Sequence, residues 1–133
     1  MSEPRSGLLF DTGALIDLYR GRPALRSRFE AVLAGTLSGY ISAITEAELW
    51  RGIKSHEIER HEALLSHFRS LAPDSSAARL AGEWMQRYEP QGLGWMDALI
   101  VATAKRADLP LLTRDAKLAR VLSSEAQFQL YQP

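Results

Sequence analysis

The sequence contains no cysteine among its 133 residues. A disulfide framework and a cysteine-ligated metal site are therefore excluded, which suits a reducing compartment. No apolar run approaches the roughly 20 residues that a membrane-spanning helix needs, and the first six residues lack the apolar core of a signal peptide. We therefore expect a soluble, cytoplasmic protein that has no membrane partner.

The chain also has no formal net charge, because 16 basic residues balance 16 acidic ones. Bulk charge thus gives no sign of nucleic-acid binding, and any such contact must come from a local patch or through a bound metal. The apolar content of 46% and the charged content of 24% are ordinary for a soluble globular protein. The length predicts one domain that spans residues 1–133.

Short apolar runs alternate with segments of helical spacing along the chain. The expected strands are residues 7–10, 39–44, 69–72, 109–113 and 128–131, and the expected helices are residues 12–19, 23–33, 45–52, 57–68, 75–88, 95–104 and 116–122. This alternation predicts an α/β protein, namely a three-layer α/β/α domain with a mainly parallel central sheet.

The most informative stretch begins at Trp95. Asp97 is the only charged residue in a run of apolar and small side chains, which indicates a helix buried on most of its surface. The short strand ending at Thr113 follows, with Asp115 two residues beyond it. In an α/β layer such a helix begins at the edge where parallel strands end, so Asp97 and Asp115 should meet at that edge.

Two further acids are expected at the same edge. Asp11 directly follows the first strand, and Glu48 lies in the first turn of the helix after the second strand, where Thr45 and Glu48 form a capping-box pattern. Taken singly, each of the four acids is more often a helix cap or a partner of the helix dipole than a ligand. Taken together, four like charges repel, and only Arg51 and Arg114 lie near them in sequence. A bound divalent cation, Mg²⁺ or Mn²⁺, is the economical explanation.

Four segments, in this order, resemble the PIN-domain nucleases, and most closely the VapC toxins of bacterial and archaeal toxin–antitoxin pairs. They are residues 9–15 (LFDTGAL), 44–52 (ITEAELWRG), 95–104 (WMDALIVATA) and 112–115 (LTRD). One departure is Gly13, which stands where many relatives have serine or asparagine. The resemblance implies a catalytic, metal-binding quartet with two supporting hydroxyls: Asp11, Glu48, Asp97 and Asp115, with Thr12 and Thr113.

The function that the resemblance implies is cleavage of phosphodiester bonds in loops of tRNA or rRNA by a metal-dependent endoribonuclease. A VapB-like antitoxin would silence the enzyme, and the toxin would form a homodimer or a dimer of dimers. The alternative from another class is a non-catalytic, Mg²⁺-binding, receiver-like regulatory module. Such modules usually carry adjacent acids after the first strand and a lysine after the last, and neither appears here.

Four residues are candidates for contacts with RNA: Trp95, Arg114, Arg20 and Arg22. Trp95 is the best base-stacking candidate because it lies two residues before Asp97. The arginines between positions 20 and 28 fit a solvated face about equally well.

Two other groups have simpler interpretations. The three histidines, His56, His61 and His67, are expected at the surface. The apolar positions of the first helices exceed what one core needs, and they are candidates for a dimer face or an antitoxin groove; they are Leu15, Leu18, Tyr19, Leu25 and Phe29.

Overall fold

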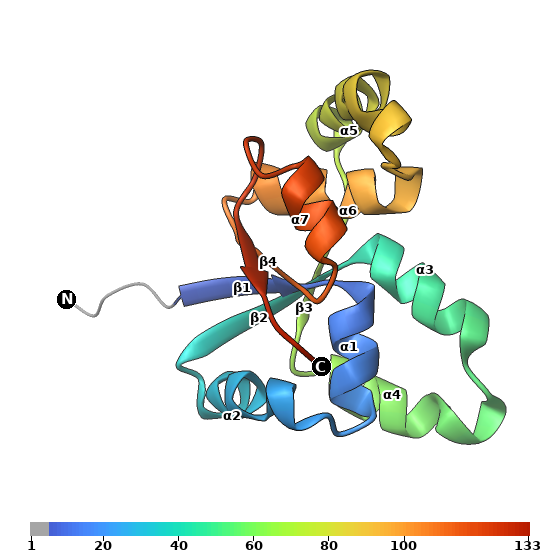
Figure 1. Cartoon of the computed structure of the whole chain (residues 1–133). Coiled ribbons are helices and arrows are strands. Elements are labelled where there is room, and N and C mark those ends of the chain that lie inside the picture. Colours follow the sequence, from blue (N-terminus) through green and yellow to red (C-terminus); the bar gives the residue numbers. More distant parts are fainter. Residues whose placement is uncertain (1–5) are drawn as a thin grey trace.

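A computed structural model describes residues 6–133, whose centre is a five-stranded parallel sheet with the order β3-β2-β1-β4-β5 (Figure 1). The strands are β1 (Ser6–Phe10), β2 (Leu37–Ser42), β3 (Arg69–Leu71), β4 (Leu111–Thr113) and β5 (Phe128–Leu130). β1 pairs with β2 on one side and with β4 on the other. The strand order therefore changes direction between β1 and β4, which is where α/β sheets place ligands.

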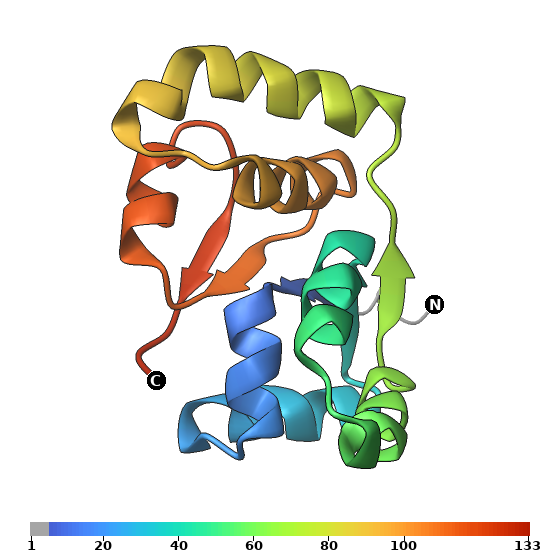
Figure 2. The same ribbon diagram turned by 90° about the vertical axis from the view of Figure 1, so that its right-hand side faces the viewer.

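Helices cover both faces of the sheet, which confirms the predicted three-layer α/β/α architecture. They are α1 (Thr12–Tyr19), α2 (Arg26–Ala34), α3 (Ala43–Gly52), α4 (Ile58–Leu65), α5 (Ser75–Tyr88), α6 (Trp95–Arg106) and α7 (Ala116–Val121), with 3₁₀ turns at Pro23–Leu25, Ser55–Glu57 and Glu89–Gln91. Figure 2 shows α5 and α6 on one side of the sheet and α1 and α2 on the other. None of the helices within residues 6–133 is both long and apolar enough to cross a membrane.

The two faces of the sheet bury separate cores. Leu9 of β1 packs with α5 and α6, whereas its neighbours Leu8 and Phe10 pack with α1 and the segment that leads into α2. Side chains of a strand alternate between faces, so an uninterrupted apolar run such as this one suits a strand that is covered on both sides. The apolar runs that predicted the strands thus explain how the sheet is held between two helical layers.

Helix α3 begins two residues earlier than expected. β2 ends at Ser42, which pairs with Leu71 of β3, and the Ser42 hydroxyl accepts a 3.1 Å hydrogen bond from the backbone N–H of Ile44. Ser42 is therefore the N-cap, and Thr45 lies inside the helix. The predicted capping box of Thr45 and Glu48 is wrong, and Glu48 lies beyond the first turn.

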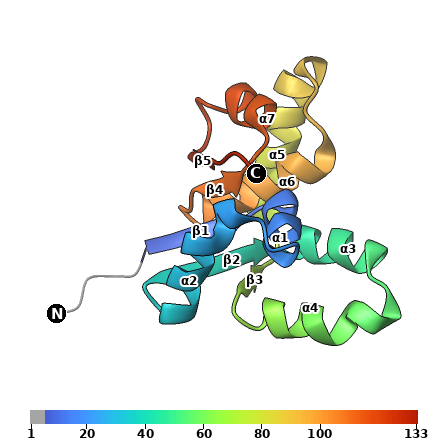
Figure 3. The same cartoon turned by 60° about the horizontal axis from the view of Figure 1, so that its bottom comes forward.

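One prediction about surface exposure is also wrong. His61, expected at the surface, is 8% exposed, and its ring stacks on that of Tyr19 with a centroid separation of 4.2 Å. The chain runs out along α3 and returns along α4 (Figure 3), and the stacking of His61 on Tyr19 brings α4 against the end of α1.

Candidate functional site

The predicted acids all lie at the carboxyl edge of the sheet. Asp11 is the N-cap of α1, and its Oδ1 accepts a 2.7 Å hydrogen bond from the backbone N–H of Ala14. Asp115 is the N-cap of α7, and its Oδ1 accepts a 3.0 Å hydrogen bond from the N–H of Leu118. Because β1 and β4 are neighbours, these two caps flank the position where the strand order changes direction.

The other two acids come from helices. Asp97 lies in the first turn of α6, as predicted, and Glu48 lies on α3. Asp97 and Asp115 line one cavity of about 40 Å³. Lys117 lines the same cavity, so it places a cation beside these carboxylates that the sequence analysis had not considered.

Burial and neighbouring negative charges raise the pKa values of two of these carboxyl groups, Asp11 and Asp97. Burial raises the pKa of Asp11 from 3.8 to about 6; hydrogen bonds from Thr113 and from the backbone of Ala14 oppose the rise, and the charges of Asp97 and Asp115 add to it. Burial also raises the pKa of Asp97, and the negative charges of Asp115 and Glu48 raise it further. The fold therefore gathers the four acids into one electrostatic unit, although they are far apart in sequence.

Thr12 connects this unit to the core. Its hydroxyl donates a 2.6 Å hydrogen bond to Oε1 of Glu48, and its Oγ1 lies 3.0 Å from Oγ1 of Thr45. Since the single proton of Thr12 goes to the carboxylate, the Thr45 hydroxyl is the donor in the second contact. Thr45 is fully buried, so it supports Thr12 from the core side. The predicted capping box had given Thr45 a different role.

Thr113 organises the opposite side of the site. Its Oγ1 accepts a 3.0 Å hydrogen bond from the backbone N–H of Asp115, and its side chain also lowers the pKa of Asp11, against the effect of burial. One buried hydroxyl thus ties the end of β4 to the N-cap of α7 and stabilises the charge of the Asp11 carboxylate at the N-cap of α1.

The acids suit a hard divalent cation by their chemistry, because carboxylate oxygens are the ligands that such cations prefer. As placed, however, no three His, Cys, Asp or Glu side chains within residues 6–133 lie close enough together to hold an ion. Glu48 is engaged with Thr12, and Asp11 and Asp115 each use one oxygen as a helix cap. The second carboxylate oxygen of each cap remains for a ligand.

The four candidate RNA-contacting residues differ in position. Trp95 is 53% exposed at the start of α6, beside α5. Arg20 and Arg22 are exposed at the end of α1, and Arg20 lines a groove of about 460 Å³ that also contains Glu48. Arg114 instead donates from Nη1 to Oδ1 and Oδ2 of Asp17, over 3.1 and 3.3 Å.

Asp17 is a site residue that the sequence analysis missed. It is completely buried in α1 between Ile16 and Leu18, and Tyr131 donates a third hydrogen bond to it, of 2.6 Å, from near the end of the chain. The one available signal was a lone charge within an apolar helical segment. Its partners are 97 and 114 residues away, so the pattern could not identify them.

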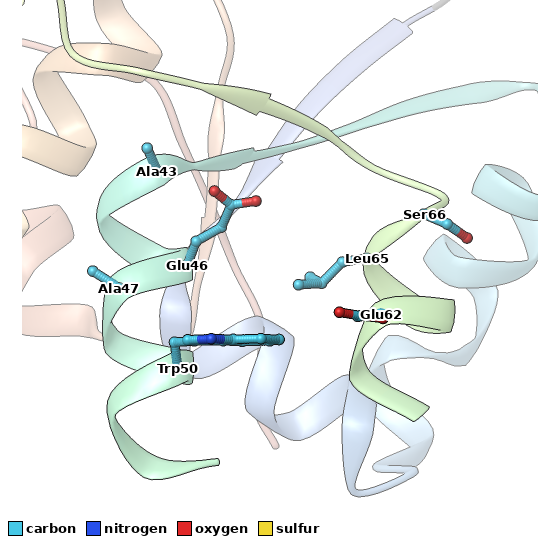
Figure 4. A pocket seen from close by; sticks show the side chains of 7 residues that line it. All are labelled: Ala43, Glu46, Ala47, Trp50, Glu62, Leu65 and Ser66. Carbon is cyan, nitrogen blue, oxygen red and sulfur yellow. The ribbon is translucent and has the colours of Figure 1, made fainter. Parts of the chain in front are cut away.

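The predicted apolar surface on the first helices is smaller than expected. Leu15 and Leu25 are only 1% and 0% exposed, so they belong to the core, whereas Leu18, Tyr19 and Phe29 are partly exposed. A groove of about 670 Å³ also lies between α3 and α4; it is lined by Ala43, Glu46, Ala47, Trp50, Glu62, Leu65 and Ser66. Figure 4 shows the Trp50 indole extending from α3 toward α4, with the carboxylates of Glu46 and Glu62 pointing into the gap.

Comparisons with known proteins agree with this architecture. Residues 8–122 match the family model described as "PIN domain". A protein named Ribonuclease VapC10 from Mycobacterium tuberculosis is 38% identical over 111 residues, which cover 80% of this chain and 80% of that protein. The match to the family covers β2, β3, β4 and the last three residues of β1.

Solved structures share the fold. A chain from a toxin–antitoxin complex of Klebsiella pneumoniae is 31% identical and superposes with a TM-score of 0.74, covering 95% of this chain and 99% of the other. A chain from the DNA-bound VapBC of Salmonella typhimurium gives a TM-score of 0.79 over 93% of this chain and 97% of the other. Its identity is 22%, so it supports the fold alone.

Proposed function

Because this chain belongs to the PIN-domain family, whose nucleases generally use divalent metals, we propose that it is a metal-dependent endoribonuclease toxin. The observation that carries the proposal is the convergence of four carboxylates where the strand order changes direction, with burial and the neighbouring carboxylate charges raising the pKa of Asp11 and of Asp97. The similarity to a protein named a ribonuclease supports RNA as the substrate. We take residues 1–133 as a single PIN-like domain.

The cofactor in this proposal is Mg²⁺ or Mn²⁺, held by Asp11, Glu48, Asp97 and Asp115. When bound, such an ion lowers the pKa of a coordinated water and neutralises charge that develops on the phosphodiester. The chain's own contribution is orientation. Thr12 holds Glu48 on α3 through its hydroxyl, and Thr113 holds the backbone of the cap at Asp115, while Asp11, Asp97 and Asp115 lie at helix starts.

The proposed substrate is a loop of tRNA or rRNA. Proteins that read RNA sequence usually contact unstacked bases in such loops, and aromatic side chains supply the stacking surface. Trp95 offers an exposed indole two residues from Asp97, while Arg20 and Arg22 offer exposed guanidinium groups at the end of α1. These three residues would position RNA across the carboxyl edge.

The proposed partner is a VapB-like antitoxin, in keeping with the toxin–antitoxin complex among the structural relatives. An amphipathic antitoxin helix with basic residues suits the groove between α3 and α4, because Trp50 and Leu65 offer apolar contacts and Glu46 and Glu62 offer negative charge. We place the toxin in the cytoplasm as a homodimer or a dimer of dimers.

Expression in a bacterial host tests the toxin assignment. The wild-type chain should arrest growth, and Asp97→Asn should not, because a helix start accepts either side chain and only the charge is lost. Asp74→Asn is the matched control, since Asp74 caps α5 away from the proposed ligands. Arrest at full strength by the Asp97 variant, or its loss in the Asp74 variant at equal expression, would contradict the assignment.

A further inference from the structure

A buried carboxylate holds an arginine at the edge of the site. Asp17 is 0% exposed, and within residues 6–133 its hydrogen-bond partners are Arg114 and Tyr131. A charge buried this deeply needs such partners, because an unpaired one is strongly destabilising. Burial raises the pKa of Tyr131, and the hydrogen bond to Asp17 raises it further, so the phenol stays protonated and donates at every ordinary pH.

Only part of the Arg114 guanidinium is used in this contact. Both of its hydrogen bonds leave from Nη1, and in the described part of the chain Nε and Nη2 donate none. The Arg114 side chain is 45% exposed, whereas that of Asp17 is 1% exposed. Nη1 is therefore anchored to a buried carboxylate, which restricts the orientation of the planar group, and the partly exposed side chain keeps its remaining donors for a ligand.

One of these remaining donors, Nε, lies beside the carboxylate edge. A Cβ placed on Gly13 would lie 3.5 Å from Nε of Arg114 and 3.6 Å from Oδ1 of Asp11. Because residue 13 has no side chain, the space between the guanidinium and the Asp11 carboxylate is not filled by one. A phosphate near the acids would find in Arg114 a planar donor group suited to its oxygens.

We propose that Arg114 contacts an RNA phosphate beside the proposed ligands, and that Asp17 and Tyr131 are positioning residues that hold its guanidinium there. The inference rests on the proposed ribonuclease function and adds a substrate-contacting group to it. Tyr131 thereby connects the end of the chain to the site, since its backbone N–H also donates to the carbonyl oxygen of Thr113 over 3.2 Å.

The first test removes the hydrogen bond from Tyr131 to Asp17 and leaves Arg114 unchanged. Tyr131→Phe removes the hydroxyl but keeps the ring, and we expect RNA cleavage (kcat/KM) to fall about tenfold. Tyr88→Phe is the matched control, because the Tyr88 hydroxyl also donates a 2.6 Å hydrogen bond to a carboxylate, that of Glu125, outside the site. Equal cleavage by the two variants would overturn the positioning role.

A double-mutant cycle separates positioning from simple stability. Arg114→Lys keeps a charge for Asp17 but loses the planar fork, so the variant should fold and cleave about a hundredfold less. If Tyr131 acts through the guanidinium, Arg114→Lys combined with Tyr131→Phe loses less than the product of the single losses. If the loss of cleavage in the double variant equals the product of the two single losses, Tyr131 acts independently of Arg114.

The phosphate contact itself is tested by salt dependence. With Asp97→Asn present to prevent cleavage, binding of a short single-stranded oligoribonucleotide is measured at several salt concentrations. Arg114→Gln, made together with Asp17→Asn so that no buried charge is left unpaired, should reduce the slope of log affinity against log salt by about 0.7. Arg106→Gln, at the far end of α6, should leave the slope unchanged, and equal slopes for both would refute the contact.

The two proposals fail in different ways. A wild-type protein that cleaves no RNA with any divalent metal would contradict the proposed function. A wild-type protein that cleaves RNA while the Tyr131 and Tyr88 variants behave alike would contradict only the inference about Arg114, Asp17 and Tyr131.

Discussion

The hydroxyl of Thr12 donates a 2.6 Å hydrogen bond to Oε1 of Glu48 and so joins the start of α1 to α3 across 36 residues of sequence. Glu48 is exposed, and the contact limits the rotamers that its side chain can adopt. Buried Thr45 contacts Thr12 from the core side. The position of the Glu48 carboxylate therefore depends on a chain of two hydroxyls.

Thr12→Val should consequently reduce cleavage about tenfold or more, the usual cost of losing a group that orients a ligand. The free energy of unfolding should fall by about 1 to 3 kcal/mol, because the hydrogen bond to Glu48 is lost and the buried Thr45 hydroxyl loses its acceptor. Thr12→Ser, which keeps the hydroxyl, should cleave normally. Thr36→Val controls for the loss of an exposed threonine hydroxyl, which there donates to the Ala31 carbonyl. Normal cleavage by Thr12→Val would show that Glu48 needs no such support.

Glu48→Gln separates charge from hydrogen bonding at this position. Glutamine still accepts the Thr12 hydrogen bond, so the melting temperature should stay close to that of the wild type. As a proposed metal ligand the side chain needs its charge, and Mn²⁺ affinity measured by calorimetry should fall at least about tenfold, with loss of most cleavage. Glu46→Gln on the same helix should change neither. Unchanged Mn²⁺ affinity in Glu48→Gln would reduce the proposed site to three acids.

The raised pKa of Asp11 makes the metal-free fold sensitive to pH. The folded protein holds a proton on Asp11 up to about pH 6, whereas the unfolded chain releases it near pH 4. The free energy of unfolding, measured by urea titration in EDTA, should therefore fall as pH rises through this window. Asp11→Asn keeps the helix cap and should be roughly 1 to 3 kcal/mol more stable than the wild type at pH 7. Equal stability at pH 7 would mean that the Asp11 carboxylate is not destabilised by its surroundings.

Two exposed tryptophans should have separate roles. Trp95→Ala should weaken binding of single-stranded RNA about tenfold, the cost of losing one stacked base, and leave antitoxin binding intact. Trp50→Ala should do the reverse, because Trp50 lines the groove between α3 and α4. Fluorescence polarisation measures the first effect, and copurification with the co-expressed product of the adjacent upstream gene measures the second. Loss of both activities in both variants would indicate a shared surface instead.

The site could be predicted where its signals are local. Asp11 directly follows β1, Asp115 follows β4 and Asp97 opens α6. The rule that parallel strands present their carboxyl ends to ligands then places these acids together without any knowledge of side-chain packing.

Other features depend on contacts that no local pattern contains. The start of α3 follows from the end of β2 at Ser42, where the strand still pairs with β3, so a capping box at Thr45 was a reasonable but wrong interpretation. His61 is buried because it stacks on Tyr19, 42 positions earlier in the sequence. Asp17 and Arg114 likewise meet only after the sheet has brought α1 next to β4.

The central claim is that the four carboxylates make this chain a metal-dependent ribonuclease. The most direct measurement is cleavage of bulk tRNA and rRNA by the purified protein with Mg²⁺, with Mn²⁺ and with EDTA, alongside Asp97→Asn and the control Asp74→Asn. We predict cleavage by the wild type and by Asp74→Asn with either metal, none with EDTA, and none by Asp97→Asn under any condition. Cleavage by the wild type that persists in EDTA, or by Asp97→Asn at the wild-type rate, would contradict the claim.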